Sequence, residues 1–251
     1  MMNIHEQGLV ENLNNLGCIG LALKLKDIFE TQHVKDEDLL SLLANTSSDE
    51  VIRIRQERAY RLLKQAGLLN SYANLDIIEY QAERNLDKTL IDRLSTCDYI
   101  RNKANIIITG AAGTGKTFLA KAFAIQACNE GFRSRIFHLR QITKQLVALE
   151  KDDHLLYEKR LKYFSRIPLL VIDEWFSIAP SKNELIVLHE LIDARYDRTS
   201  TIICSQMPKE NWATFSGTTA IGEAITGRLS AQCFKIALEG SDIRTRHSER
   251  P

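Results

Sequence analysis

The chain has 251 residues, enough for one large domain or for a medium domain and a small one. Hydrophobic residues make up 44% of it and charged residues 26%, which is ordinary for a soluble globular protein. Because 33 basic residues are balanced by 32 acidic ones, the overall charge does not mark a nucleic-acid-binding protein. A DNA partner would have to be held by a local basic surface.

Cysteine usage and hydropathy indicate a soluble protein of the cytoplasm. The five cysteines form no C-x-x-C pair, which argues against a zinc site and against a disulfide framework. The N-terminus lacks the basic and apolar segments of a signal peptide. The most apolar long stretch, residues 118–128, is interrupted by Lys121 and Gln126 and is too short to cross a bilayer, which takes about 20 apolar residues. We therefore expect a cytoplasmic protein with no membrane partner.

Residues 1–67 have the pattern of helices and predict a small all-α N-terminal domain. The run from Ser47 to Glu50 has the S-x-x-E form of a capping box, so a helix is predicted to begin there and to end at Gly67. Its exposed side would be basic, with Arg53, Arg55, Arg58, Arg61 and Lys64. A solvated helix surface is a simpler explanation of these charges than a surface for DNA or a partner.

Residues 68–104 are predicted to form a connector with one helix near residues 86–94, and the chain changes character at residue 105. From there, predicted strands at 106–108, 135–139, 169–172, 201–204 and 234–238 alternate with helices. The helices are expected at 118–130, 140–150 and 154–164, and from a second capping box, Ser181 to Glu184, towards Asp197. This alternation predicts an α/β domain over residues 105–251, with a mostly parallel five-stranded sheet between helices.

A phosphate-binding loop is the strongest motif. The form G-x-x-x-x-G-K-[ST] is matched in full by Gly110, Ala111, Ala112, Gly113, Thr114, Gly115, Lys116 and Thr117. Glycines let the backbone curl so that N–H groups face phosphate oxygens, and the following helix offers its positive end. Lys116 supplies a cation for the β- and γ-phosphates, and the Thr117 hydroxyl can ligate Mg²⁺. Because a predicted strand precedes the loop and a predicted helix follows it, we predict an ATP site rather than a chance glycine-rich turn.

Two carboxylates follow the predicted strand at 169–172. Asp173 would hold Mg²⁺, and Glu174 would orient or deprotonate the attacking water. A pair of acids in an exposed turn is the alternative, but the phosphate loop upstream favours the catalytic interpretation. Gln206 follows the next predicted strand and could contact the γ-phosphate or the water, although an ordinary polar strand-end residue is an equal alternative.

Further segments occur in an order and spacing that one known family shares: Thr96 to Arg101, Asn105 to Gly110, Asp173 to Trp175, Arg195 to Ile203, Ser205 to Pro208, and Glu239-Gly240 followed by Arg244. On these residues the chain resembles the IstB-type helper ATPases of bacterial insertion sequences. They are relatives of the DnaC helicase loaders within the AAA+ superfamily of P-loop ATPases. The resemblance covers nearly the whole chain.

The resemblance implies roles for three further residues. Gln206 stands at the family's sensor position, and Arg228 matches the arginine finger that would act on the ATP of a neighbouring subunit. Without the resemblance, an ordinary surface arginine is the better interpretation of Arg228. Arg244 matches the arginine of the family's Gly-Glu-Ser-x-Arg ending, at the nucleotide. The early helices match a domain used for self-assembly and partner contact. Two departures occur, because Gly227 replaces the usual Asp before Arg228 and residues 241–243 differ before Arg244.

The resemblance also implies DNA contacts from helices inserted between the second and third strands. The basic residues predicted to make them are Arg140, Lys144, Lys159, Arg160 and Lys162. Aromatic side chains are interleaved with them, namely Tyr157, Tyr163 and Phe164. Composition alone allows an ordinary solvated helix surface equally well, and the resemblance favours sequence-independent contact with the phosphates of duplex DNA.

The resulting hypothesis is an ATP-hydrolysing helper of transposition that assembles on DNA as a homo-oligomer and serves a transposase. A DnaC-like loader of a replicative helicase is the nearest alternative, since it would share the core and differ in its partner. A small-molecule kinase would leave Glu174 and Arg228 without roles. A DNA-binding module that holds ATP without hydrolysing it is the remaining alternative.

Overall fold

The computed structural model describes residues 2–31, 39–80, 84–217, 219–240 and 242. The chain divides into two compact units, Met1–Arg61 and Leu62–Pro251. The division falls inside helix α3 (Leu39–Ala66), shortly before the predicted boundary at residue 67. The predicted connector, residues 68–104, belongs to the second unit.

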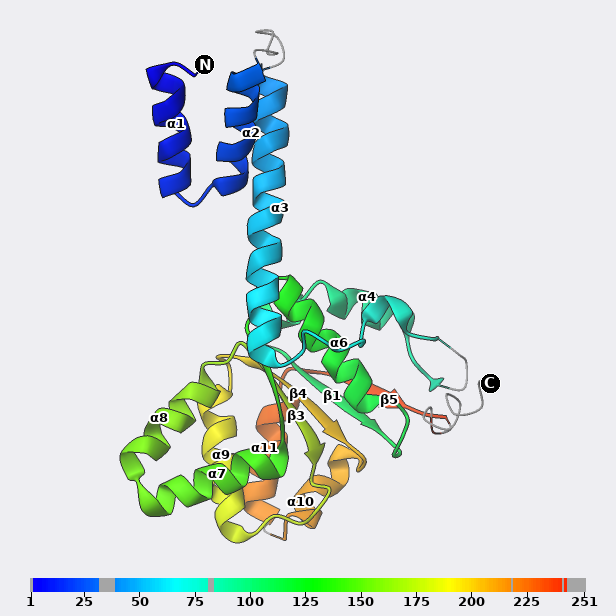
Figure 1. The fold of residues 1–251 in the computed structure, drawn as a ribbon. Coiled ribbons are helices and arrows are strands. Elements are labelled where there is room, and N and C mark those ends of the chain that lie inside the picture. The colour runs from blue at the N-terminus through cyan, green and yellow to red at the C-terminus, as the bar shows by residue number, and fades with distance from the viewer. Residues whose placement is uncertain (1, 32–38, 81–83, 218, 241, 243–251) are drawn as a thin grey trace. The chain divides into compact units, whose positions relative to one another are not determined.

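The first unit consists of α1 (Ile4–Asn15), α2 (Ile19–Thr31) and most of α3 (Figure 1). This confirms the predicted helical N-terminal region. Its packing is sparse, because α1 buries no residue and α2 buries only Ala22 and Leu25. Large apolar side chains stay in solvent, with Ile4 78% and Leu16 77% exposed. These helices therefore gain little stability from a core of their own.

The capping box predicted at Ser47 is wrong, because α3 already begins at Leu39. The hydroxyls of Ser47 and Ser48 donate to the Ala44 carbonyl, one turn earlier in the same helix, at 2.9 and 2.8 Å. Glu50 is buried and accepts from the backbone N–H of Leu21 at 3.2 Å and from the Arg53 guanidinium at 2.6 Å. The serines thus bond backward inside a helix, as mid-helix serines can, and Glu50 joins α3 to α2.

The second unit contains a sheet with strand order β2-β3-β4-β1-β5, and every pairing is parallel among the described residues. The strands are β1 (Asn105–Gly110), β2 (Ser134–His138), β3 (Leu169–Trp175), β4 (Ser200–Ser205) and β5 (Cys233–Leu238). The five predicted strands and their parallel arrangement are confirmed. Because all strands run the same way, their carboxyl ends meet at one edge, where the predicted nucleotide site would lie.

Helices cover both faces of this sheet (Figure 1). On one face, Ile106, Ile108 and Val171 pack against α6 (Lys116–Asn129) and the connector. On the other, Ile107, Ile172 and Ile203 pack against α7 (Leu139–Asp152), α8 (His154–Ser165), α9 (Lys182–Arg195), α10 (Trp212–Phe215) and α11 (Thr219–Ser230). The alternation of side chains along each strand supplies both layers.

The capping box predicted at the start of α9 is confirmed. The Ser181 hydroxyl accepts from the Glu184 N–H at 3.3 Å, and the Glu184 carboxylate accepts from the Ser181 N–H at 2.8 Å. The same carboxylate accepts from the Thr143 hydroxyl of α7 at 3.1 Å. The N-terminus of α9 is therefore fixed both locally and to the neighbouring helix.

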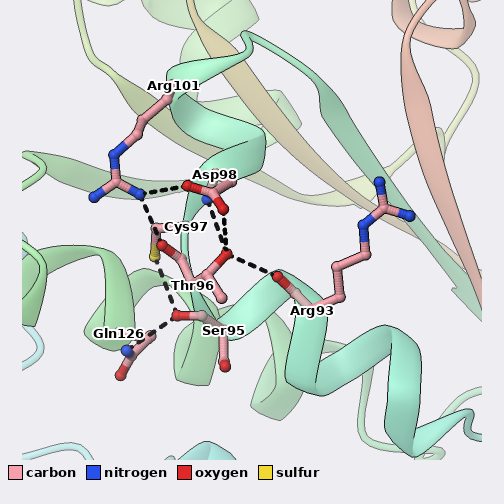
Figure 2. A network of polar contacts seen from close by, with 7 residues as sticks. All are labelled: Arg93, Ser95, Thr96, Cys97, Asp98, Arg101 and Gln126. Carbon is pink, nitrogen blue, oxygen red and sulfur yellow. Dashed lines mark hydrogen bonds and ion pairs between the residues drawn. The ribbon is translucent and has the colours of Figure 1, made fainter.

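The connector contains the short helices η2 (Leu75–Ile77), α4 (Lys88–Ser95) and α5 (Asp98–Arg101), and η4 (Lys209–Asn211) follows β4 later in the chain. Figure 2 shows the polar network that joins α4 to α5, with Thr96 at its centre. The Thr96 hydroxyl donates to the Arg93 carbonyl at 2.9 Å, and Arg101 donates to the Thr96 carbonyl and the Asp98 carboxylate at 2.9 and 2.8 Å. Gln126 of α6 donates to the Ser95 carbonyl at 3.1 Å. The bonds around Thr96 thus join α4 to α5, and the Ser95 carbonyl ties the connector to α6.

The cysteines are not joined to one another in the fold, and several of them lie in its core. All five cysteines are free, and Cys97, Cys128 and Cys204 are buried. Burial raises the pKa of the Cys97 thiol to about 12, so this group is not a reactive thiolate. Of the helices within the described ranges, none combines the length and hydropathy that a bilayer-spanning segment needs.

Candidate nucleotide-binding site

The predicted phosphate loop connects the carboxyl end of β1 to the start of α6. Its glycines have positive φ angles, of 152° at Gly110, 78° at Gly113 and 95° at Gly115. A side chain on Gly110 would place its Cβ 2.3 Å from the Leu238 carbonyl oxygen. Both the turn and the close approach of β5 therefore require glycine here. Strand, loop and helix follow one another as the motif requires.

Lys116, Thr117 and Asp173 meet at this loop. Lys116 is 9% exposed, and its ammonium donates to the carbonyls of Gly110 and Ala111 at 2.8 and 2.6 Å. The Thr117 hydroxyl donates to Asp173 Oδ2 at 2.7 Å, although the two residues are far apart in sequence. The other carboxylate oxygen of Asp173 accepts from the Glu174 N–H at 2.8 Å. Two hard oxygen donors thus lie together beside the lysine, a set suited to a divalent cation.

Glu174 has a backbone conformation that its strand position alone would not predict. Its φ is 55°, in the left-handed region, and Phe176 has a φ of 50°. Side chains with a Cβ rarely adopt this region, and such strain collects at functional sites. The Glu174 side chain is 59% exposed, whereas the adjoining Asp173 is buried. Asp173 is therefore buried against the phosphate loop, whereas Glu174 is open to solvent.

His138 is a neighbour of the site that the sequence did not reveal. It ends β2, pairs in register with Asp173, and has its Nδ1 3.5 Å from Glu174 Oε2. The sequence places His138 in a predicted strand, but the contact depends on the pairing of β2 with β3. Gln206, which was predicted, is exposed and follows β4. Because β4 lies between β1 and β3, Gln206 stands between the phosphate loop and Glu174 in the strand order.

Arg228 lies near the amino ends of the strands, opposite the carboxyl ends where the phosphate loop begins. The Asn105 amide, at the start of β1, donates to the carbonyl of Leu229 at 3.2 Å. The phosphate loop begins at the other end of the same strand, about 17 Å away at the usual rise per residue. Arg228 donates from Nε to Asp193 Oδ1 of α9 at 2.7 Å. Within a single chain, this arginine is therefore not part of the ATP site.

The C-terminal part of the site is described only at residue 242. Arg244 lies outside the described residues. The carboxyl carbon of Asp242 lies only 2.0 Å from the position that a Cβ on Gly113 would take. The Asp242 carboxylate thus packs directly on the phosphate loop at Gly113, where the φ of 78° favours glycine.

The predicted DNA contacts lie on α7 and α8. Arg140, Lys144, Lys159 and Lys162 are exposed. Arg160 is half-buried, donates to Gln145 at 3.1 Å, and stacks over the ring of Phe164 at 5.1 Å. Two of the interleaved aromatic side chains are buried, because Tyr157 and Phe164 are 2% and 0% exposed. The surface therefore presents cations, while these two rings belong to the core.

Comparison with known proteins gives a family and several relatives. The family model for IstB-like ATP binding protein matches residues 13–251. The protein named for ATP binding in insertion sequence IS1162 of Pseudomonas fluorescens is 33% identical over 83% of this chain and 88% of its own length. The insertion sequence protein y4pL of Sinorhizobium fredii, also named for ATP binding, is 27% identical over 94% of this chain and 95% of its own.

Solved structures share the fold at low identity. The DnaC helicase loader matches with a TM-score of 0.52 and 19% identity, over 67% of this chain and 98% of that one. A DNA replication initiation factor matches with a TM-score of 0.55 and 17% identity over 71% of this chain, which spans about half (53%) of that protein. These likenesses show a shared fold. Together with the family match and the insertion-sequence relatives, they lead to one conclusion: the chain is an ATPase that belongs to the family of IstB-like ATP-binding proteins.

Proposed function

We propose that the protein is an ATP-driven helper of insertion-sequence transposition. With ATP bound, copies of the chain assemble on duplex DNA, and each copy completes the ATP site of its neighbour. The assembly presents its DNA to a transposase of the same element, and hydrolysis through Glu174 resets it. ATP then acts as an assembly switch and not as a phosphate donor to a metabolite.

The separation of Arg228 from the phosphate loop is the observation that supports this proposal most. An arginine finger stabilises the charge of the transferring phosphoryl group and has to reach the γ-phosphate. Arg228 is bonded beside the amino edge of the sheet, a strand length from its own loop. It can serve an ATP site only in a second copy, so a working site requires assembly.

Mg²⁺ fits the Thr117 and Asp173 oxygens. This ion prefers oxygen ligands, keeps several waters, and is commonly held by one or two carboxylates together with phosphate oxygens. When bound, it would neutralise charge that develops on the phosphates. Glu174, which is open to solvent, would orient or deprotonate the attacking water, and Gln206 would contact that water or the γ-phosphate.

The test is to measure ATP turnover and sedimentation, with and without duplex DNA, for the unaltered chain and three variants. Lys116→Ala should lose ATP binding, assembly and turnover. Glu174→Gln should bind ATP and assemble but not turn over. Arg228→Ala should bind ATP while turnover falls about 10³-fold, because the finger charge is missing. Unchanged hydrolysis in Arg228→Ala would remove the shared site.

The identity of the partner needs a separate measurement. The likeness to the DnaC loader concerns the fold alone, whereas the matched relatives are named for insertion sequences. Immobilised protein with ATP and DNA should retain the transposase of its own element and not a replicative helicase. Retention of the helicase alone would favour a loader.

A further inference from the structure

Arg228 forms a hydrogen-bonded ion pair with Asp193, an acid of α9. The Arg228 Nε donates to Asp193 Oδ1 at 2.7 Å, and Nη1 donates to the Ala224 carbonyl at 3.3 Å. Across the described residues, Nη2 has no hydrogen-bond partner. The guanidinium is thus fixed at two of its three nitrogens, and the third is left available for an anion.

Two packed helices hold this pair. Asp193 lies in α9 and Arg228 in α11, and the residues beside them, Ile192 and Leu229, are both 2% exposed in one core cluster. The Arg228 side chain is 29% exposed, so it is in part accessible to solvent. A charge-assisted bond between helix-borne groups restricts the guanidinium to one orientation.

Gly227 makes this carboxylate more important. The resemblance implies an Asp before the finger arginine, and this chain has Gly227 there. A Cβ at Gly227 would meet nothing within 4 Å, so crowding does not explain the glycine. In the described part of the chain, Asp193 is the carboxylate that bonds Arg228.

We propose that Asp193 is a positioning residue for the arginine finger. It fixes Nε of Arg228 and leaves Nη2, which has no hydrogen-bond partner among the described residues, to meet the γ-phosphate of ATP bound by a second copy of this chain. An arginine that is held before assembly loses less conformational freedom when the shared site closes. This inference rests on the proposed shared ATP site and adds the group that preorganises it.

The test compares kcat and KM for DNA-stimulated ATP hydrolysis in Asp193→Asn and Asp193→Ser. Both should lower kcat about tenfold, less than the loss from Arg228→Ala, because the cation remains but is no longer held. ATP binding should not change, since Asp193 is remote from its own phosphate loop. Glu223→Gln is the matched control: it removes an exposed acid of α11 that is not bonded to Arg228, and its kcat should equal that of the unaltered chain.

A mixing experiment separates positioning from a general structural defect. Glu174→Gln copies cannot hydrolyse ATP but carry a correctly held Arg228, which they can offer to the intact site of an Asp193→Asn copy. An equal mixture should therefore turn over faster than the sum of its parts. A sum without gain, or an unchanged or raised kcat in both Asp193 variants, would overturn the role of Asp193. If Arg228→Ala also keeps full turnover, the shared site itself fails; if Arg228→Ala is impaired, only the role of Asp193 fails.

Discussion

Arg195 is a charged residue in the interior that joins several elements. Its guanidinium donates to the carbonyls of Phe164, Ile167 and Ser200 at 2.6, 3.0 and 2.5 Å, and to the Thr201 hydroxyl at 3.0 Å. Removal from water lowers its pKa to about 9, so the group stays charged at neutral pH. The oxygens belong to the end of α8, the turn between α8 and β3, and the start of β4, so Arg195 joins these three segments to α9.

Replacement of Arg195 by methionine should therefore destabilise the second unit by about 3–5 kcal/mol, because buried carbonyls lose their donors. Arg198→Met is the matched control: Arg198 is exposed, and the free energy of unfolding should change by less than about 0.5 kcal/mol. Urea denaturation followed by circular dichroism measures both. Equal stability of the two variants would contradict the structural role of Arg195.

At the scale of elements, two S-x-x-E runs that look alike in the sequence have different roles. Ser181 is the N-cap of α9, with reciprocal bonds to Glu184. Ser47 lies inside α3 and bonds backward to Ala44. Whether such a run begins a helix depends on whether the preceding residues are already helical, and that is decided by packing along the chain.

Ser181→Ala should cost about 1 kcal/mol of stability, because an orphan N–H at the start of α9 loses its acceptor. Ser47→Ala should leave helix content unchanged or raise it slightly, since alanine is the better residue inside a helix. Urea denaturation measures the first effect and circular dichroism the second. A loss of helix content in Ser47→Ala would instead support a capping box at Ser47.

The exposed lysines of α7 and α8 lead to a prediction about DNA. If Lys144 and Lys159 each contact one phosphate, replacing both with alanine should weaken binding to all duplex sequences alike. The slope of log K against log salt should fall in magnitude by about 0.9 for each lost contact. Lys182→Ala, an exposed lysine at the start of α9, is the control for charge alone. Fluorescence anisotropy over a salt series measures this slope. A slope equal to that of the unaltered chain would exclude these contacts.

At the scale of the whole molecule, the two compact units differ in how much core they have. The second unit packs a parallel sheet between helices on both faces, with many strand residues fully buried. Among its described side chains, the first unit has few buried apolar residues, and α1 contributes none. Stability is therefore distributed unevenly along the chain.

Hydrogen exchange should record this difference. Backbone amides of α1 and α2 should exchange orders of magnitude faster than those of β1, β3 and β4, because few apolar contacts oppose local opening. If ATP and DNA drive self-assembly through the first unit, protection there should rise in the assembled state. Protection in α1 equal to that of the central strands, in the chain alone, would show a core that the described contacts do not contain.

The sequence alone determined the phosphate loop, the five strands and their order of appearance, because these signals are local. The loop from Gly110 to Thr117 follows a β-branched run and opens a helix, and a contiguous segment needs no distant partner to be recognised. Asp173 and Glu174 were likewise predictable from the strand that they end. The residues that lie beside them on neighbouring strands could not be predicted in this way.

Only the tertiary structure decided which distant groups meet. The bond from Thr117 to Asp173, the contact of His138 with Glu174 and the pairing of Arg228 with Asp193 all depend on how strands and helices pack. Packing also placed Tyr157 and Phe164 in the core rather than on the basic surface. The physical reason is that spacing along the chain fixes local backbone geometry, whereas burial and partners are set by elements far away in sequence.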